Sequence, residues 1–281
     1  MYTLPLPKNA ISRRINLEPV VMTGGGRAVL MQVAHPSVAA GVANFSDYRT
    51  DPWNRLFRTL DVMFKLAFGT PEQSKQQEKI LAARHRRVAG ENELGERYTA
   101  MDPALLVWVW ATLVDTSVAV YENVYGPLRP DQRERFYQEQ KAVAVGCHTP
   151  VDVIPANWDA FRDYWDKVVA NDLHITEPAM DVMRASMAPP LPRPFDKLSG
   201  ASTAVTVYLL PESVREMFGL TLTPGLERTA KSFFSTARLG RYVPQSIRHA
   251  PALYQVRRKR PIRVKKGAGS LMLSRQGSAP S

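Results

Sequence analysis

The chain has 281 residues, of which 44% are hydrophobic, so it can bury the core of one large domain. The formal net charge is +11, but residues 257–266 carry seven basic side chains and no acid, which leaves only +4 (11 less 7) for the rest. This basic segment lacks the interleaved aromatic residues of nucleic-acid-binding segments, so we expect no nucleic-acid partner.

The N-terminus and the cysteine usage bear on the compartment. Residues 1–19 contain Pro5 and Pro7 and no continuous apolar run after a basic start, so neither a secretory signal nor a lipid anchor is visible. The single cysteine, Cys147, excludes an intramolecular disulfide and a thiolate metal cluster, and we predict that it is buried. We therefore expect a cytoplasmic protein, with a weak contact of the basic tail with a membrane surface as a secondary prediction.

The first part of the chain predicts an extended arm over residues 1–19 and a flexible turn at the three glycines 24–26. These glycines lack the preceding strand, the second spaced glycine and the Lys-Ser/Thr ending of phosphate-binding loops, so a nucleotide site is not supported. His35 stands before Pro36, a position that is pushed out of the helical conformation. His35 therefore lies at a bend, where it either caps a helix end or points into a pocket.

Two helices, over residues 53–68 and 71–90, are predicted to form an antiparallel hairpin. Asp-Pro and Thr-Pro start signals precede them, and Gly69 ends the first. Arg55 and Thr59 share one stripe of the first helix, which is otherwise mostly apolar.

In the second helix of this pair, His85 shares a face with Leu81, Ala82 and Val88, which turns the histidine inward. Arg55 lies near the start of its helix and His85 near the close of the next. Both side chains are therefore expected to face one space.

Residues 103–125 form an apolar run about as long as a membrane span, with Asp115 at its centre. An ionised carboxylate in lipid is costly, so we interpret the run as a buried helix of a globular protein. Asp115 then needs a partner, for which an inward arginine or histidine is the obvious candidate. Trp108, Trp110 and Tyr121 are predicted core aromatics.

The remaining pattern is helical, over residues 130–146, 157–171, 177–187, 198–210, 211–218 and 226–242, with a proline-rich connector at 188–194. We predict a helix rather than a strand for 198–210, because no other segment offers it a strand partner. The sequence thus predicts an all-α protein: an arm (1–19), a single multi-helix domain (20–250) and a basic, disordered tail (251–281).

Taken alone, these residues leave two interpretations of His85 open. An inward imidazole on a helix can coordinate haem iron through one ring nitrogen, provided that the other nitrogen is hydrogen-bonded to fix the tautomer, and arginines beside it can neutralise haem propionates or polarise dioxygen. A histidine whose hydrogen bonds are satisfied within the core fits the same pattern. No His or carboxylate follows His85 at the spacing of a di-iron or zinc site.

Four motifs, read together, resemble the family that contains the latex clearing proteins (rubber oxygenases) and the fungal mycophenolic-acid oxygenase MpaB. They are GGRAVLMQVAHPSVAAGV (25–42), FSDYRTDPWNRLFRTLDVMFKLAFGTPEQ (45–73), ARHRRVAG (83–90) and YTAMDPALLVWVWATLVDTSVAVYE (98–122), and the likeness extends over about 20–250. In rubber oxygenases a helical, globin-like core holds a b-type haem, and dioxygen cleaves a C=C bond of an isoprenoid chain. The resemblance implies a globin-like core, haem b and iron here as well.

The resemblance also assigns site residues. His85 corresponds to the proximal iron ligand, with His35 as the alternative ligand, and Arg55, Arg58 and Thr59 match the distal R-x-x-(K/R)-T stretch. Arg58 occupies the place of a lysine of the rubber enzymes, and Trp110 occupies the place where many relatives have a histidine. No acidic residue matches the catalytic glutamate of the rubber enzymes; the nearby acids are Asp47 and Asp51.

The resemblance implies a haem b-dependent oxygenase in which His85 holds the iron, Arg55 and Thr59 orient dioxygen, and Arg58 lies on the same side. An apolar substrate would enter against Phe57 and Phe64. A lipid, terpenoid or secondary metabolite is expected rather than polymeric rubber, because no secretion signal is visible. The alternative is a non-catalytic haem or hydrophobic-ligand carrier.

Overall fold

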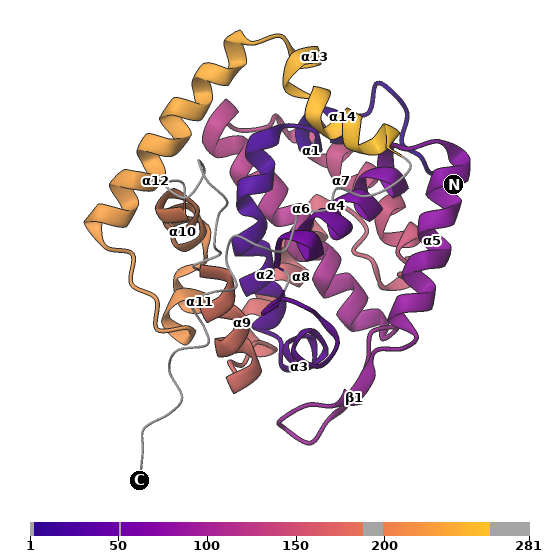
Figure 1. Cartoon of the computed structure of the whole chain (residues 1–281), viewed down its shortest axis with the longest axis vertical. Coiled ribbons are helices and arrows are strands. Elements are labelled where there is room, and N and C mark those ends of the chain that lie inside the picture. The colour runs from indigo at the N-terminus through magenta and orange to yellow at the C-terminus, as the bar shows by residue number, and fades with distance from the viewer. Residues whose placement is uncertain (1–2, 51, 188–198, 259–281) are drawn as a thin grey trace.

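The computed structural model describes residues 3–50, 52–187 and 199–258, and regular structure in them is almost entirely helical (Figure 1). The α-helices are α1 (Ile11–Asn16), α2 (Gly25–Val33), α3 (Pro36–Phe45), α4 (Pro52–Phe68), α5 (Pro71–His85), α6 (Pro103–Tyr125), α7 (Pro130–Gly146), α8 (Trp158–Asn171), α9 (Glu177–Met187), α10 (Ser199–Leu209), α11 (Glu212–Met217), α12 (Pro224–Ala237), α13 (Gln245–Arg248) and α14 (Ala250–Arg257). Short 3-10 helices are η1 (Pro19–Gly24), η2 (Val151–Val153) and η4 (Arg238–Tyr242). The prediction of an all-α fold is confirmed. The predicted connector at 188–194 and the tail beyond 258 lie outside the described residues.

One two-stranded hairpin interrupts the helices. Strands β1 (Ala89–Glu91) and β2 (Arg97–Thr99) pair antiparallel, with Gly90 opposite Tyr98. This hairpin is not predicted by the sequence pattern, which indicated a helix up to residue 90 instead. The expected helix at 198–210 is present as α10, although the chain does form strands elsewhere.

Helix α6 passes through the centre of the molecule and organises the largest hydrophobic cluster (Figure 1). Its residues Val107, Ala111 and Val114 are at most 1% exposed and belong to a cluster shared with α2, α7, α8 and α9. Trp108 donates its indole N–H to the carbonyl of Met31 at 3.2 Å. Burial of this many apolar side chains is the dominant favourable term in folding.

Helix α6 is long and apolar enough to cross a membrane, but 67% of its most apolar window is buried inside the fold. Asp115 at its centre pairs with Arg27 of α2 and with Arg162 of α8, both at 2.5 Å. Arg27 also donates to Thr116 Oγ1 (2.6 Å) and to the carbonyl of Leu209 (2.7 Å). Arg27 therefore confirms the prediction that an inward arginine or histidine pairs with Asp115, and the more exposed Arg162 adds a second ion pair.

The N-terminal segment is not extended throughout, because residues 11–16 form α1. Ile11 and Ile15 are buried in the main cluster. Glu139 of α7 accepts hydrogen bonds from the backbone N–H groups of Ile11 (3.1 Å) and Ser12 (2.7 Å). A carboxylate at a helix N-terminus satisfies its free donors, so this short helix is stabilised by tertiary contacts that a local pattern does not reveal.

The three glycines are helical rather than a flexible turn: Gly24 closes η1, and Gly25 and Gly26 open α2. A Cβ on Gly26 would lie 2.3 Å from Thr206 Oγ1, and one on Gly24 would lie 2.5 Å from Thr116 Cγ2. Two of the three glycines therefore let helices approach closely.

The C-terminal elements are tied to the rest of the fold by a buried carboxylate. Glu18, 2% exposed, accepts hydrogen bonds from Arg248 Nη2 (2.6 Å), His249 Nε2 (3.1 Å) and the Tyr125 hydroxyl (2.9 Å). Burial alone would raise the pKa of Glu18, but these hydrogen bonds outweigh it and lower the pKa to about 2. Helix α14 then packs against α4, so the residues just after 250 belong to the helical body.

Candidate functional site

Helices α4 and α5 form the expected hairpin. Thr70 and Gln73 close a capping box at the turn, in which each side chain accepts a hydrogen bond from the other residue's backbone N–H. The hydroxyl of Ser74 donates to the carbonyl of Leu66 at 2.8 Å and ties the two helices together. Figure 1 shows α4 crossing the middle of the molecule and α5 lying on its right-hand edge.

His85 is the last residue of α5, which ends five residues earlier than predicted. Its side chain is half-buried, and its Nδ1 is shielded from solvent without a hydrogen-bond partner in the described residues. Burial, and then the charges of His148 and Arg84, lower the pKa of His85 below its usual range. The imidazole is therefore neutral at physiological pH, which is the form that binds metals.

Val88, three residues further on, packs beside Ala40, Tyr98 and Leu105. The chain around His85 is thus placed where α3, the β-hairpin and the start of α6 meet. A buried ring nitrogen without a partner is unusual for a core histidine.

Arg55 lies in the first turns of α4, at the open end of the same hairpin as His85. It is half-buried, and no described residue gives its guanidinium a hydrogen bond or a carboxylate partner. Burial, and then the charge of Arg58, lower the pKa of Arg55. A desolvated cation without a counter-charge is costly, so this position suits an anionic or electron-rich ligand group.

Arg58 and Thr59 follow on the same helix but are more exposed. Arg58 Nη2 lies 3.4 Å from Asp47 Oδ2, beyond the end of α3. The Thr59 hydroxyl donates to the backbone carbonyl of Arg55 at 3.0 Å. Asp47 therefore forms an ion pair with Arg58. Asp51, the other acidic residue named for the catalytic glutamate, lies outside the described residues. The proposed distal roles of Arg58 and Thr59 stay predictions.

His35 is the N-cap residue of α3. Its Nδ1 accepts a hydrogen bond from the backbone N–H of Ser37 at 3.3 Å. Burial lowers the pKa of His35, against the charges of Asp172, Glu96 and Asp102. Capping was one of the two interpretations of this histidine, and the structure places it in that position. Its role as an alternative iron ligand stays a prediction.

Trp110, in the place where many relatives have a histidine, is a core aromatic as predicted. Its indole N–H donates to the carbonyl of Gln140 at 3.0 Å, and its ring lies 5.6 Å from Tyr137 and 6.0 Å from Phe161. Phe64 is likewise buried, in a second core cluster that includes Phe68 and residues of α7 and α14. Because the Phe64 ring is packed inside this cluster, little of its surface is left to contact a substrate.

Comparison with known proteins decides the family. The family model described as ER-bound oxygenase mpaB/B'/Rubber oxygenase, catalytic domain, matches residues 12–241. The chain belongs to this oxygenase family. Two relatives described as uncharacterized proteins, Mb2261 of Mycobacterium bovis and Rv2237 of Mycobacterium tuberculosis, are each 29% identical over 225 residues, covering 77% of this chain and 87% of theirs. No solved structure is significantly similar.

Two features of this mpaB/rubber oxygenase family member escaped the sequence analysis. On α4, Asp61 and Lys65 are both buried and form an ion pair at 2.8 Å, one helical turn apart. The i,i+4 spacing of opposite charges on an apolar helix was the available signal. Arg27, the buried partner of Asp115, gave no local signal beyond a charge within an apolar segment.

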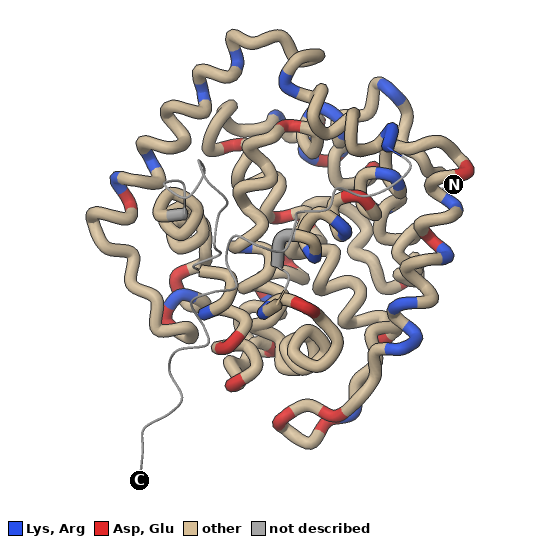
Figure 2. The backbone as a smooth tube through the Cα atoms, viewed as in Figure 1, with Lys and Arg blue, Asp and Glu red and all other residues tan. Residues whose placement is uncertain are grey.

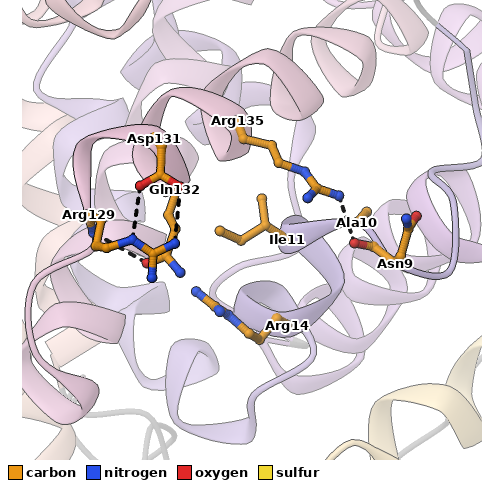
Figure 3. A pocket seen from close by; sticks show the side chains of 8 residues that line it. All are labelled: Asn9, Ala10, Ile11, Arg14, Arg129, Asp131, Gln132 and Arg135. Carbon is orange, nitrogen blue, oxygen red and sulfur yellow. Dashed lines mark hydrogen bonds and ion pairs between the residues drawn. The ribbon is translucent and has the colours of Figure 1, made fainter.

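A pocket of about 200 Å³ opens between α1 and the start of α7, and three arginines approach it (Figure 3). Arg129 pairs with Asp131 at 3.0 Å, and Arg135 donates to the carbonyl of Asn9 at 2.9 Å. None of the predicted site residues lines it, so it is distinct from the site at the hairpin. Across residues 3–50, 52–187 and 199–258, no three His, Cys, Asp or Glu side chains gather as a metal-binding group.

Proposed function

We propose that this protein is a haem b-dependent oxygenase that uses dioxygen on an apolar substrate, such as an isoprenoid, a lipid or a secondary metabolite, by oxidative cleavage of a C=C bond. The observation that carries the proposal is the buried Nδ1 of His85, which has no hydrogen-bond partner among the residues that the structure describes, in a chain of an oxygenase family. A single axial histidine is enough to hold haem iron, whereas a metal ion bound directly by the protein needs several ligands in one place.

The residues present fit a haem in two respects. His85 has a neutral, half-buried imidazole, and its Nδ1, which has no partner among the described residues, is the ring nitrogen available to an iron. Arg55 has a desolvated guanidinium without a carboxylate partner in the described residues, which suits a propionate or the oxygen atoms of the reaction. When bound, haem supplies the redox chemistry that activates dioxygen.

The protein residues have positioning roles in this proposal. Arg55 orients oxygen atoms through charge-assisted hydrogen bonds, which are about twice as strong as neutral ones. The Thr59 hydroxyl lies one turn further along α4. It donates a hydrogen bond to the backbone carbonyl of Arg55, and this bond fixes the position of the hydroxyl. Phe57, half-buried on the same helix, offers an apolar wall to the substrate. A cytoplasmic location is also part of the proposal, and the lone Cys147, whose pKa burial raises to about 12, is compatible with it.

A non-catalytic haem or hydrophobic-ligand carrier is the second candidate. Arg58 favours it, because this residue replaces the lysine of the rubber oxygenases and lies 3.4 Å from Asp47. An arginine always stays protonated, whereas a lysine can lose its proton and take part in proton transfer.

The test uses full-length protein supplied with haem during expression. The oxygenase proposal predicts a Soret band and dioxygen uptake that depends on added squalene or another apolar alkene. A Soret band without alkene-dependent uptake would favour the haem carrier, and the absence of any Soret band would contradict both the oxygenase and the haem carrier. Arg58→Lys, with the exposed Arg129→Lys as matched control, tests whether the lysine of the rubber enzymes raises uptake at unchanged haem content.

A further inference from the structure

Exposed apolar side chains concentrate near the C-terminal end of the described chain. Ten large hydrophobic side chains are exposed among the described residues, and half of them fall within residues 239–254. These five are Leu239 (63% exposed), Tyr242 (72%), Val243 (40%), Ile247 (61%) and Tyr254 (59%). They come from η4, α13, α14 and the short link between η4 and α13, and we call them together the C-terminal face. Soluble proteins rarely gather exposed apolar groups in this way unless something binds there.

The same part of the chain is free of acidic residues. After Glu227 the sequence contains thirteen Lys and Arg side chains and neither Asp nor Glu. Figure 2 shows basic positions along α12 and on towards α14, at the upper rim of the molecule. A segment that is basic and free of acidic side chains is attracted to an anionic surface.

Arginines and tyrosines are paired on this face. The guanidinium of Arg241 lies 5.0 Å from the ring centre of Tyr242 and donates to its hydroxyl at 3.0 Å. Arg258 lies 5.3 Å from the ring centre of Tyr254 and donates to its hydroxyl at 3.1 Å. Each pair joins an amphipathic ring to a cation, a combination that suits the headgroup layer of a membrane.

The fold holds this face in a fixed position. Arg248 donates to the carbonyls of Gly240 (3.1 Å) and Val243 (2.6 Å) and to the buried carboxylate of Glu18 (2.6 Å). The next residue, His249, contacts the same carboxylate. The apolar side chains are therefore presented by an ordered frame, which lowers the entropy lost when they bind.

We propose that the C-terminal face docks the protein on the surface of an anionic phospholipid bilayer. The aliphatic and aromatic side chains would enter the headgroup and acyl boundary, while Arg241 and Arg258 meet the lipid phosphates. A second copy of the chain is disfavoured as the occupant because two acid-free basic faces repel each other. The inference goes beyond the proposed oxygenase function and does not depend on haem.

The test is co-sedimentation of the full-length protein with vesicles of phosphatidylglycerol and phosphatidylcholine in equal parts, and with vesicles of phosphatidylcholine alone. Tyr242→Ser combined with Ile247→Ser removes two apolar groups of the face. Leu94→Ser combined with Val151→Ser is the matched control, since these side chains are also exposed (52% and 48%) but lie on other elements. Thermal melts of both double variants confirm that each is folded.

We expect the wild-type protein and the control to bind the anionic vesicles, to bind neutral ones much less, and to be released by high salt. The Tyr242→Ser/Ile247→Ser variant should partition about tenfold more weakly, because each lost side chain removes apolar surface from the lipid. Equal binding by the two double variants, or no binding of the wild-type protein to anionic vesicles, would overturn the proposal. A dimer in light scattering that only the face variant dissociates would assign the face to self-association instead.

Discussion

Removal of the Asp115 carboxylate should be among the most damaging single changes in the helical body. The side chain of Arg27 is 4% exposed and that of Asp115 is 11% exposed. In Asp115→Ala, Arg27 would keep its bonds to Thr116 and Leu209 but would stay charged and buried without a counter-charge. Breaking a buried pair in this way costs about 3–5 kcal/mol, a large part of the roughly 5–15 kcal/mol of total stability that is typical of a domain.

The matched comparison is Arg162→Ala, because Arg162 is 37% exposed and its removal leaves Asp115 paired with Arg27. We expect that variant to lose only about 1 kcal/mol. Urea unfolding followed by circular dichroism measures both losses. The double replacement Asp115→Leu/Arg27→Met should recover much of the loss, since a buried apolar pair avoids the desolvation cost. If Asp115→Ala lost no more than Arg162→Ala, the buried pair would not stabilise α6 as argued.

Three further predictions concern the buried carboxylate of Glu18, the candidate site and the glycines at the start of α2. Glu18 has a folded pKa of about 2, below its ordinary 4.5, so its contribution is complete above about pH 4.5 and is lost as the pH falls towards 2. Glu18→Gln should lower the free energy of unfolding by about 2 kcal/mol at neutral pH. Thermal melts of this variant should also show a smaller loss of stability between pH 4.5 and 2 than melts of the wild-type protein. Arg55→Met should weaken haem binding about tenfold in a spectroscopic titration, without loss of thermal stability, while Arg55→Lys retains part of the affinity. Gly26→Ala should cost about 1–3 kcal/mol because its Cβ meets Thr206, whereas Gly25→Ala has open space and should raise stability by up to about 1 kcal/mol in chemical denaturation.

The parts of the fold that sequence reasoning predicted well have strong local signals. A proline at the first helical position predicted where α4, α5 and α6 begin, and with it the hairpin of α4 and α5. The physical cost of an unpaired buried carboxylate predicted that Asp115 needs an arginine or histidine. The choice of Arg27 and Arg162 could not be predicted, because it depends on how α2 and α8 pack against α6.

Other features depend on contacts between distant segments. The strands of the β-hairpin have three residues each, too few to show an alternating pattern, and the backbone N–H of Ala100 donates to the carbonyl of Val88. This pairing ends α5 at His85. At the candidate site, the helical wheel put Arg55 on a stripe with Thr59, but it could not show that Arg58 lies beside Asp47.

The central claim is that His85 is the residue that binds the haem iron, and the visible spectrum of His85→Ala tests it most directly. The control is His35→Ala, which removes a helix-capping imidazole on another element. We predict that His85→Ala loses the native axial spectrum while circular dichroism still shows a helical fold, and that His35→Ala keeps the spectrum. An unchanged spectrum in His85→Ala, with its loss in His35→Ala, would contradict the account and move the ligand to His35.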